Sequence, residues 1–282
     1  MAKAETIRRE LRGKLELRLA RHGALFYGLA DGKILTSGDD AETVWQTLPQ
    51  ELGKLDPRYF GWGGARTRFL EIFSAGFEDP GYAAHERDYK LKARAKLASS
   101  MPLETALTAS GAGEAVLAAY RATNLLASFE MMRIADVLRS PQADAFVRAA
   151  AAFTLSPDAR TLKTLELILT PFDCAKWTVI TYLPFLWQPE THMFLKPTVT
   201  TDFAARVGHG FASAYEPKLD IAVYEGLRDL AARTAAEIAD LNPRDRIDLQ
   251  SFIWVIGGAY GDAKERFTDS DVFVVKTPAP PA

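Results

Sequence analysis

Two Ser-Pro dipeptides, at Ser140-Pro141 and Ser156-Pro157, interrupt a long run of helix-forming residues in the middle of the chain. Each offers a hydroxyl that can cap a helix and a proline at the first helical position, where its missing N–H costs nothing. Upstream, Ser110 can cap a helix that carries Glu114 in its first turn and continues to Leu138. Three helices in succession with tight breaks predict a helical bundle.

The N-terminal quarter predicts a helix, a β-hairpin and a second helix. Between residues 4 and 19 an apolar residue recurs every four positions with charges between, which favours an amphipathic helix: Ile7, Leu11, Leu15 and Leu19. Asp31-Gly32 then separates two apolar segments within residues 25–35, and both residues tolerate the positive φ that a tight hairpin turn requires. A helix around Trp45 is expected to follow.

Short helices in a glycine-punctuated loop are expected over residues 56–80, and a charged helix over 82–98. Apolar spacing predicts another helix over residues 220–240. The segment Asn242-Pro243-Arg244-Asp245 supplies an N-cap residue, a proline at the first helical position and an acid at the third. It therefore predicts a last helix, which ends at Gly257-Gly258.

Two segments have the composition of strands. Residues 178–183 are β-branched and aromatic, but their continuous apolar run fits a helix equally well. Residues 193–197 form a short apolar run closed by proline, which indicates a strand at the edge of a sheet.

The chain is therefore predicted to be mainly helical, of α+β class, with a helical bundle in the middle and short strands in the N-terminal hairpin and around 192–197. We expect an N-terminal region over 1–155 and a C-terminal, mainly helical region over 156–276 packed on it, or one domain that contains both. The proline-rich tail, 277–282, is expected to be extended or disordered.

Composition argues against several classes of protein. Hydrophobic residues at 48% and charged residues at 25% are typical of soluble globular domains, and the apolar runs are far shorter than the roughly 18 residues of a membrane span. The charged N-terminus does not resemble a secretory signal, and the only cysteine, Cys174, allows no intrachain disulfide, so a cytoplasmic location is expected. A net charge of -2 gives no global attraction to nucleic acid or to acidic membranes.

The first candidate site is basic. Arg87, Lys90 and Arg94 belong to a group of five cations within residues 87–96, and Arg66 and Arg68 follow an aromatic segment. Cations beside planar rings can hold phosphates and stack bases, although a solvated helix face is the ordinary alternative. We therefore favour an accessory binding protein for an anionic ligand, with nucleic acid as one such ligand.

The second candidate is an enzyme pocket around Tyr182, His192, Lys196 and Asp248. A lysine that follows an apolar strand can meet an anionic group, and a histidine can move protons near neutral pH. The spacing of Glu190 and His192 matches no zinc motif, so no metal is expected. Core or surface packing is the ordinary alternative, and in that case a carboxylate should hold Lys196.

The third candidate is acidic. Asp245 and Asp248, followed by Gln250, share one helix face and could bind a cation or act as acid and base. Acids in a first helical turn also stabilise the helix dipole, which explains the pair more simply. Because the chain has no phosphate-binding loop, dinucleotide fingerprint or serine elbow, no cofactor is assigned. A protein partner or a second copy, bound through the helical middle, is a further alternative.

Four segments of the chain resemble a group of uncharacterised bacterial proteins: Phe60-Gly61-Trp62-Gly63-Gly64-Ala65, Glu86-Arg87-Asp88-Tyr89-Lys90, His192-Met193-Phe194-Leu195-Lys196-Pro197 and Asp248-Leu249-Gln250-Ser251-Phe252-Ile253-Trp254. The resemblance covers most of the chain and implies a bacterial, cytoplasmic protein. It implies no activity, cofactor or functional residue.

Overall fold

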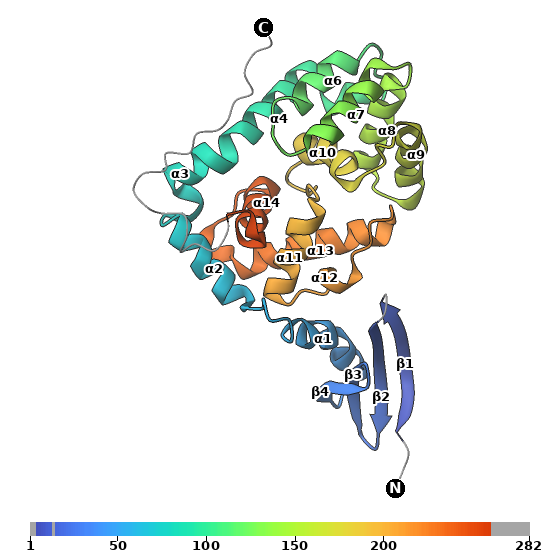
Figure 1. The fold of residues 1–282 in the computed structure, drawn as a ribbon, viewed down its shortest axis with the longest axis vertical. Coiled ribbons are helices and arrows are strands. Elements are labelled where there is room, and N and C mark those ends of the chain that lie inside the picture. The colour runs from blue at the N-terminus through green and yellow to red at the C-terminus, as the bar shows by residue number, and fades with distance from the viewer. Residues whose placement is uncertain (1–3, 13–14, 261–282) are drawn as a thin grey trace.

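The computed structural model describes residues 4–12 and 15–260 of the chain (Figure 1). A small antiparallel sheet and one helix lie at one end of the molecule, and the other helices form a larger body. The protein is therefore mainly helical with a minor sheet, which confirms the predicted α+β class. Within the described ranges, no helix is both long enough and apolar enough to span a membrane.

The sheet is a meander in which each strand pairs with the next in antiparallel register: β1 (Glu5–Arg12), β2 (Leu15–His22), β3 (Leu25–Ala30) and β4 (Lys33–Gly38). Asp31 and Gly32 form the turn between β3 and β4, with φ of 45° and 79°. The predicted hairpin is confirmed, because a two-residue turn with both φ values positive suits the twist of paired strands.

The helix expected over residues 4–19 is wrong, since this segment forms β1 and β2. A spacing of four residues is also a multiple of the two-residue period of a strand, so it does not separate the two structures. Leu17 and Leu19 alternate along β2 and are buried with Trp45 of α1 (Ala41–Gly53), which covers one face of the sheet. Asp40 caps that helix by accepting a hydrogen bond from the backbone N–H of Thr43.

The body consists of the following helices: α2 (Gly61–Ile72), α3 (Pro80–Tyr82), α4 (Asp88–Ser100), α5 (Leu103–Ala106), α6 (Gly113–Tyr120), α7 (Ser128–Arg139), α8 (Ala143–Leu155), α9 (Ala159–Leu169), α10 (Trp177–Trp187), α11 (Pro197–Val207), α12 (Phe211–Ala214), α13 (Ile221–Glu237) and α14 (Arg246–Trp254). Short 3₁₀ turns connect some of them: η1 (Gly76–Glu78), η3 (Thr170–Phe172) and η4 (Ala239–Leu241). Two π-helical turns, η2 (Ala83–Arg87) and η5 (Val255–Ala259), precede α4 and follow α14.

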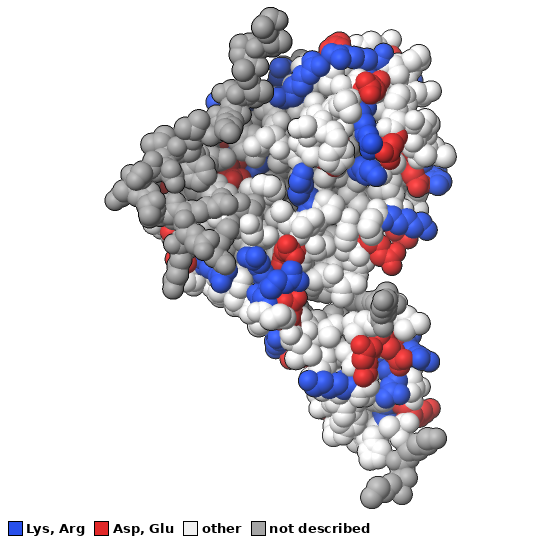
Figure 2. Space-filling model, in the orientation of Figure 1, with Lys and Arg blue, Asp and Glu red and all other residues white. Residues whose placement is uncertain are grey.

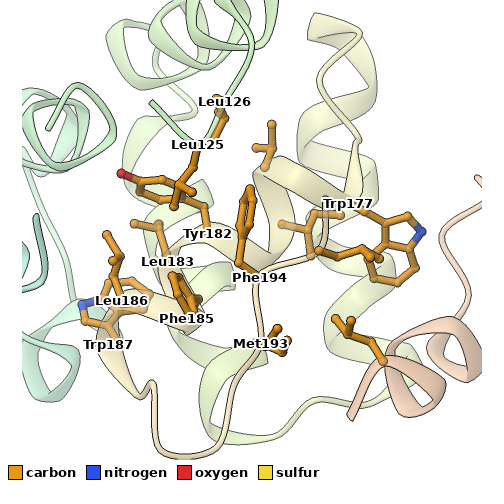
Figure 3. Close-up of a cluster of buried hydrophobic side chains, with 14 of the residues drawn as sticks. Leu125, Leu126, Trp177, Tyr182, Leu183, Phe185, Leu186, Trp187, Met193 and Phe194 are labelled. Carbon is orange, nitrogen blue, oxygen red and sulfur yellow. The ribbon is translucent and has the colours of Figure 1, made fainter. Parts of the chain in front are cut away.

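One hydrophobic core runs through the body from Ala65 to Ile256, and a separate small core lies between the sheet and α1. The two cores therefore divide the chain near residue 55. At the centre of the body, every residue of α10 is buried, which is typical of a helix surrounded by others. Residues 178–183, for which strand and helix were both predicted as alternatives, are therefore helical. Figure 3 shows side chains of α10 packed with Phe194.

The strand expected around 192–197 is wrong. Residues 192–196 belong to no helix or strand, and Pro197 is the first residue of α11. Met193, Phe194 and Leu195 are buried because they cross the core between α10 and α11. An apolar run closed by proline fits this path as well as an edge strand.

Several predicted helix boundaries differ from the structure. The run from Ser110 to Leu138 is two helices, α6 and α7, separated by residues 121–127. Asp158, and not Ser156, caps α9, and Asp245, and not Asn242, caps the last helix. In both cases a carboxylate lies closer to the first turn than the expected cap. The helix over 220–240 is confirmed as α13, and the tail 277–282 lies outside the described residues.

Candidate functional site

An ionic network, buried except at Arg244, joins the start of α4 to the start of α14. Its members come from η2, α4 and the loop and first turn of α14, and they carry three positive and three negative groups: Glu86, Arg87, Lys90, Arg244, Asp245 and Asp248. π-helical turns occur frequently at functional sites, and both π-helical turns of the described chain adjoin this network.

Arg87 connects the two carboxylates of α14. Its Nη1 atom lies 2.9 Å from Asp245 Oδ1 and 2.6 Å from Asp248 Oδ1, and its Nη2 atom lies 2.7 Å from Asp245 Oδ2. Asp248 also accepts hydrogen bonds from the Tyr82 hydroxyl and from the backbone and side chain of Arg244. Burial opposes the ionisation of Asp248, but the hydrogen bonds from Arg244 and Tyr82 outweigh it and lower its pKa.

Lys90 is fully buried, with its Nζ atom 3.2 Å from Glu86 Oε2 and 2.8 Å from Ser251 Oγ. Burial lowers the pKa of Lys90 to about 8, although the nearby Glu86 carboxylate acts in the opposite direction. The second oxygen of Glu86 accepts a hydrogen bond of 2.7 Å from the Tyr260 hydroxyl. Both oxygens of this buried carboxylate therefore have a partner.

Ser251 and Lys90 have the composition of a serine–lysine catalytic pair, but their geometry does not suit one. The Ser251 hydroxyl donates to the backbone carbonyl of Ile247 at 2.9 Å, and the side chain is fully buried within α14. A nucleophile must reach its substrate, so we interpret the pair as part of the network that joins α4 and α14.

A cavity of about 50 Å³ lies beside this network, with Glu86 as the shared residue. Its wall is formed by His85, Glu86, Tyr89, Asn124, Leu125, Phe194, Lys196 and Trp254. The residues come from η2, α4, the break before α7, the segment before α11, and α14. The cavity is thus built from parts of the chain that are far apart in sequence.

Hydrogen-bond donors dominate the polar groups around this cavity. Lys196 Nζ donates to the carbonyl of Leu125 at 3.1 Å and lies 4.0 Å from Glu130 Oε2, which leaves it further N–H groups. Within the described part of the chain, the side chains of Tyr89, Asn124 and Trp254 make no hydrogen bond. Burial, with Glu86 nearby, raises the pKa of Tyr89, so its phenol remains a donor.

The residues of the predicted basic surface do not form one exposed basic patch in the structure. Arg66 pairs with Asp240, with 2.7 Å from Nε to Oδ2, and Arg94 pairs with Glu190, with 2.8 Å from Nη2 to Oε1. The Arg68 guanidinium lies over the ring of Phe60, 4.1 Å from its centroid. Figure 2 shows blue and red side chains interspersed on the visible face, with acids beside many of the cations. Arg87 and Lys90 are inside the protein.

The four residues of the predicted enzyme pocket do not line a common cavity in the structure. Tyr182 is buried and donates to the carbonyl of Ala119 at 2.8 Å, and His192 Nδ1 lies 2.6 Å from the Tyr224 hydroxyl. Asp248 belongs to the ionic network. Of these four residues, Lys196 alone lines the small cavity. The carboxylate expected to hold Lys196 is Glu130.

Tyr89, Asn124 and Trp254 were not identified from the sequence as site residues. Glu86 and Tyr89 are three residues apart, so helical periodicity alone places them on one face. Asn124 has no such signal, because its position depends on the break between α6 and α7. Comparisons with protein family models, curated proteins and solved structures found no match to this chain.

Proposed function

We propose that this protein binds a small anionic ligand, or the anionic end of a larger one, in the cavity beside Lys196. The observation that carries the proposal is the convergence of residues whose side chains carry hydrogen-bond donors: Lys196, Tyr89, Asn124 and Trp254 line one cavity. An anion would supply acceptors for these groups, and hydrogen bonds to a charged partner are the stronger kind.

Glu86 lines the same cavity, but its charge is largely compensated. Lys90 lies 3.2 Å from one of its oxygens and Tyr260 donates to the other. Glu130 is occupied in a similar way, since it accepts hydrogen bonds from the backbone of Ala127 and from Thr178. The uncommitted N–H groups of Lys196 therefore favour a negative ligand.

The cavity volume limits what can enter. About 50 Å³ is less than the volume of two water molecules in the liquid, at roughly 30 Å³ each. A carboxylate or a comparable oxyanion group suits this space, with the rest of a longer ligand extending past the exposed Asn124 and His85. A nucleic acid has less support, because the predicted basic residues are paired with acids, packed on a ring or buried.

Calorimetric titration with sodium acetate and with inorganic phosphate tests the proposal. We expect one of them to bind, and Tyr89→Phe to weaken that binding about tenfold, since a hydrogen bond to a charged group contributes roughly 1.5–3 kcal/mol. Lys196→Gln should weaken it further. The matched control is Lys163→Gln, which changes an exposed lysine on α9 and should leave the affinity unaltered.

Tyr89→Phe removes a hydroxyl that has no hydrogen-bond partner among the described residues, so the fold should be retained. If neither anion binds the unmodified protein, or if Tyr89→Phe binds it with unchanged affinity, the proposal is wrong. Equal weakening by Lys163→Gln would indicate a general charge effect.

A further inference from the structure

A second, larger cavity of about 310 Å³ lies where the sheet and α1 meet the helical body. This volume falls at the lower end of the range for small-molecule sites, which often lie at the junction of two structural units. One wall comes from the end of α1 and the linker that follows it, and the other from α11 and the start of α12.

The junction around this cavity is closely packed. A Cβ atom on Gly53 would lie 2.5 Å from the Cα atom of Gly208, so the two backbones touch at this point. The backbone N–H of Phe60 donates to the carbonyl of Arg206 at 2.9 Å, and Arg58 Nη1 lies 2.5 Å from Asp202 Oδ1. These contacts hold the two walls at a fixed separation.

The hydroxyl and imidazole donors of the cavity are already used within the protein. The Thr201 hydroxyl donates to the carbonyl of Pro197 at 3.0 Å, and the Ser213 hydroxyl to that of Gly210 at 3.1 Å. His209 accepts from the backbone N–H of Phe211 at Nδ1, so its Nε2 atom carries the proton and lies 3.2 Å from Asp229 Oδ2. His209 is therefore no base for Ser213, and the cavity is not a nucleophilic site.

Acceptors remain available. Asp202 Oδ2 accepts no hydrogen bond from the described residues, and the oxygens of Thr201 and Ser213 retain lone pairs. Two carboxylates, Asp56 and Asp202, lie on the cavity with one guanidinium, Arg58, so the lining carries a net negative charge. The apolar part of the lining includes Pro49, Leu52, Ala205 and Ala212.

We propose that this cavity binds an aliphatic amine, with its ammonium group on Asp202 and its methylene chain against the apolar wall. The volume of about 310 Å³ holds a molecule of roughly ten non-hydrogen atoms, taking ~30 Å³ for each water-sized group. An organic cation fits better than a metal ion, because no cluster of three metal-ligating side chains occurs in the described ranges.

The test compares two ligands of equal length, 1,8-diaminooctane and 1,8-octanediol, by calorimetric titration against the full chain. We expect the diamine to bind at least tenfold more tightly than the diol. Asp202→Asn should weaken diamine binding at least tenfold, whereas Asp136→Asn, the same change at an exposed position on α7, should leave it unaltered.

Ala212→Leu provides a second test that changes no charge, because the added methyl groups occupy the cavity; it should also weaken diamine binding at least tenfold. Failure of the unmodified protein to bind the diamine overturns the proposal, as does equal binding of the diol. If Asp202→Asn does not fold, the Ala212→Leu result decides, and unchanged affinity in a folded Ala212→Leu protein rejects the site. None of these outcomes depends on the anion cavity.

Discussion

Lys90 and Glu86 lie one helical turn apart, with their charged groups 3.2 Å from each other and both side chains inside the protein. Ordinary i, i+4 pairs on helix surfaces contribute little to stability. In a buried pair, a large desolvation cost opposes a large electrostatic attraction. Removing one partner leaves the other charged and desolvated. The pair therefore fixes how η2 and α4 pack on α14, where Ser251 binds the same ammonium group.

Lys90→Met should lower the free energy of unfolding by about 3–5 kcal/mol, because it leaves the buried Glu86 carboxylate with Tyr260 as its remaining partner. Glu86→Gln should cost less, since Lys90 can lose its proton near pH 8. The double variant should be more stable than Lys90→Met alone. Urea denaturation of all four proteins measures the coupling, and additive effects would contradict it.

The pH dependence of stability should reveal Lys90 directly. Its pKa is about 8 in the folded protein and near 10.5 in the unfolded chain, so between these values the unfolded chain binds more protons. The Lys90 contribution to the free energy of unfolding should therefore rise by roughly 1.5 kcal/mol between pH 8 and 9.5. Cys174 opposes part of this rise, because burial raises its pKa to about 12. Above pH 10 the buried tyrosines, including Tyr82, lower the free energy of unfolding as the pH rises. Burial raises their pKa values, so the folded chain then binds more protons than the unfolded chain. Lys90→Met should lack the rise, and an identical profile in that variant would refute the assignment.

His192 should have the corresponding effect on the acid side. Burial lowers its pKa to about 4, although a hydrogen bond to the backbone of Thr154 opposes the shift. Between pH 6.5 and 4 the unfolded chain again binds more protons, so stability falls as the pH falls. Burial also lowers the pKa of His209, which contributes with the same sign. Comparing the unfolding profile of His192→Gln with the unmodified protein isolates His192, and the slope between pH 6.5 and 4 should be smaller in the variant.

Asp245 has two structural roles that one pair of variants separates. Its Oδ1 atom caps α14 by accepting from the backbone N–H groups of Ile247 and Asp248, and its carboxylate pairs with Arg87. Asp245→Asn keeps a good N-cap and loses the ion pair, whereas Asp245→Ala loses both. The alanine variant should be less stable than the asparagine variant by about 1 kcal/mol in thermal or urea unfolding. Equal stability would mean that the cap contributes nothing measurable.

Local signals in the sequence predicted the elements that depend on local chemistry. Asp31-Gly32 specified its hairpin turn, and the spacing of apolar residues located α13. The N-terminal strands were missed because the four-residue spacing of Ile7, Leu11, Leu15 and Leu19 fits both periods. In the structure Leu15 and Leu19 pack in the core beside α1, whereas Ile7 and Leu11 are exposed.

The candidate site was harder to predict because it depends on long-range pairing. Residues 87–96 were predicted to form a basic surface. In the structure Arg87 and Lys90 are neutralised by Glu86 and by carboxylates at the start of α14, about 160 residues further along the chain. Lys196 was identified as a candidate, but its neighbours in the cavity, Tyr89 and Asn124, are brought to it by the packing of α4 and the α6–α7 break.

Replacing a helical glycine by alanine should have opposite effects on the free energy of unfolding at two positions, Gly113 and Gly63. Gly113 begins α6 where it meets α7, and a Cβ atom there would lie 2.0 Å from the backbone carbonyl oxygen of Leu138. This oxygen cannot move without shifting α7, so Gly113→Ala should lower the free energy of unfolding by about 1–3 kcal/mol. Gly63 lies in α2, and a Cβ atom there would have no neighbouring atom within 4 Å. Gly63→Ala should therefore raise the free energy of unfolding by about 0.5–1 kcal/mol, because it reduces the freedom of the unfolded chain. Thermal and urea unfolding of both variants measure the difference. If Gly113→Ala matched the stability of Gly63→Ala, α6 and α7 would not be in the close contact that the structure describes.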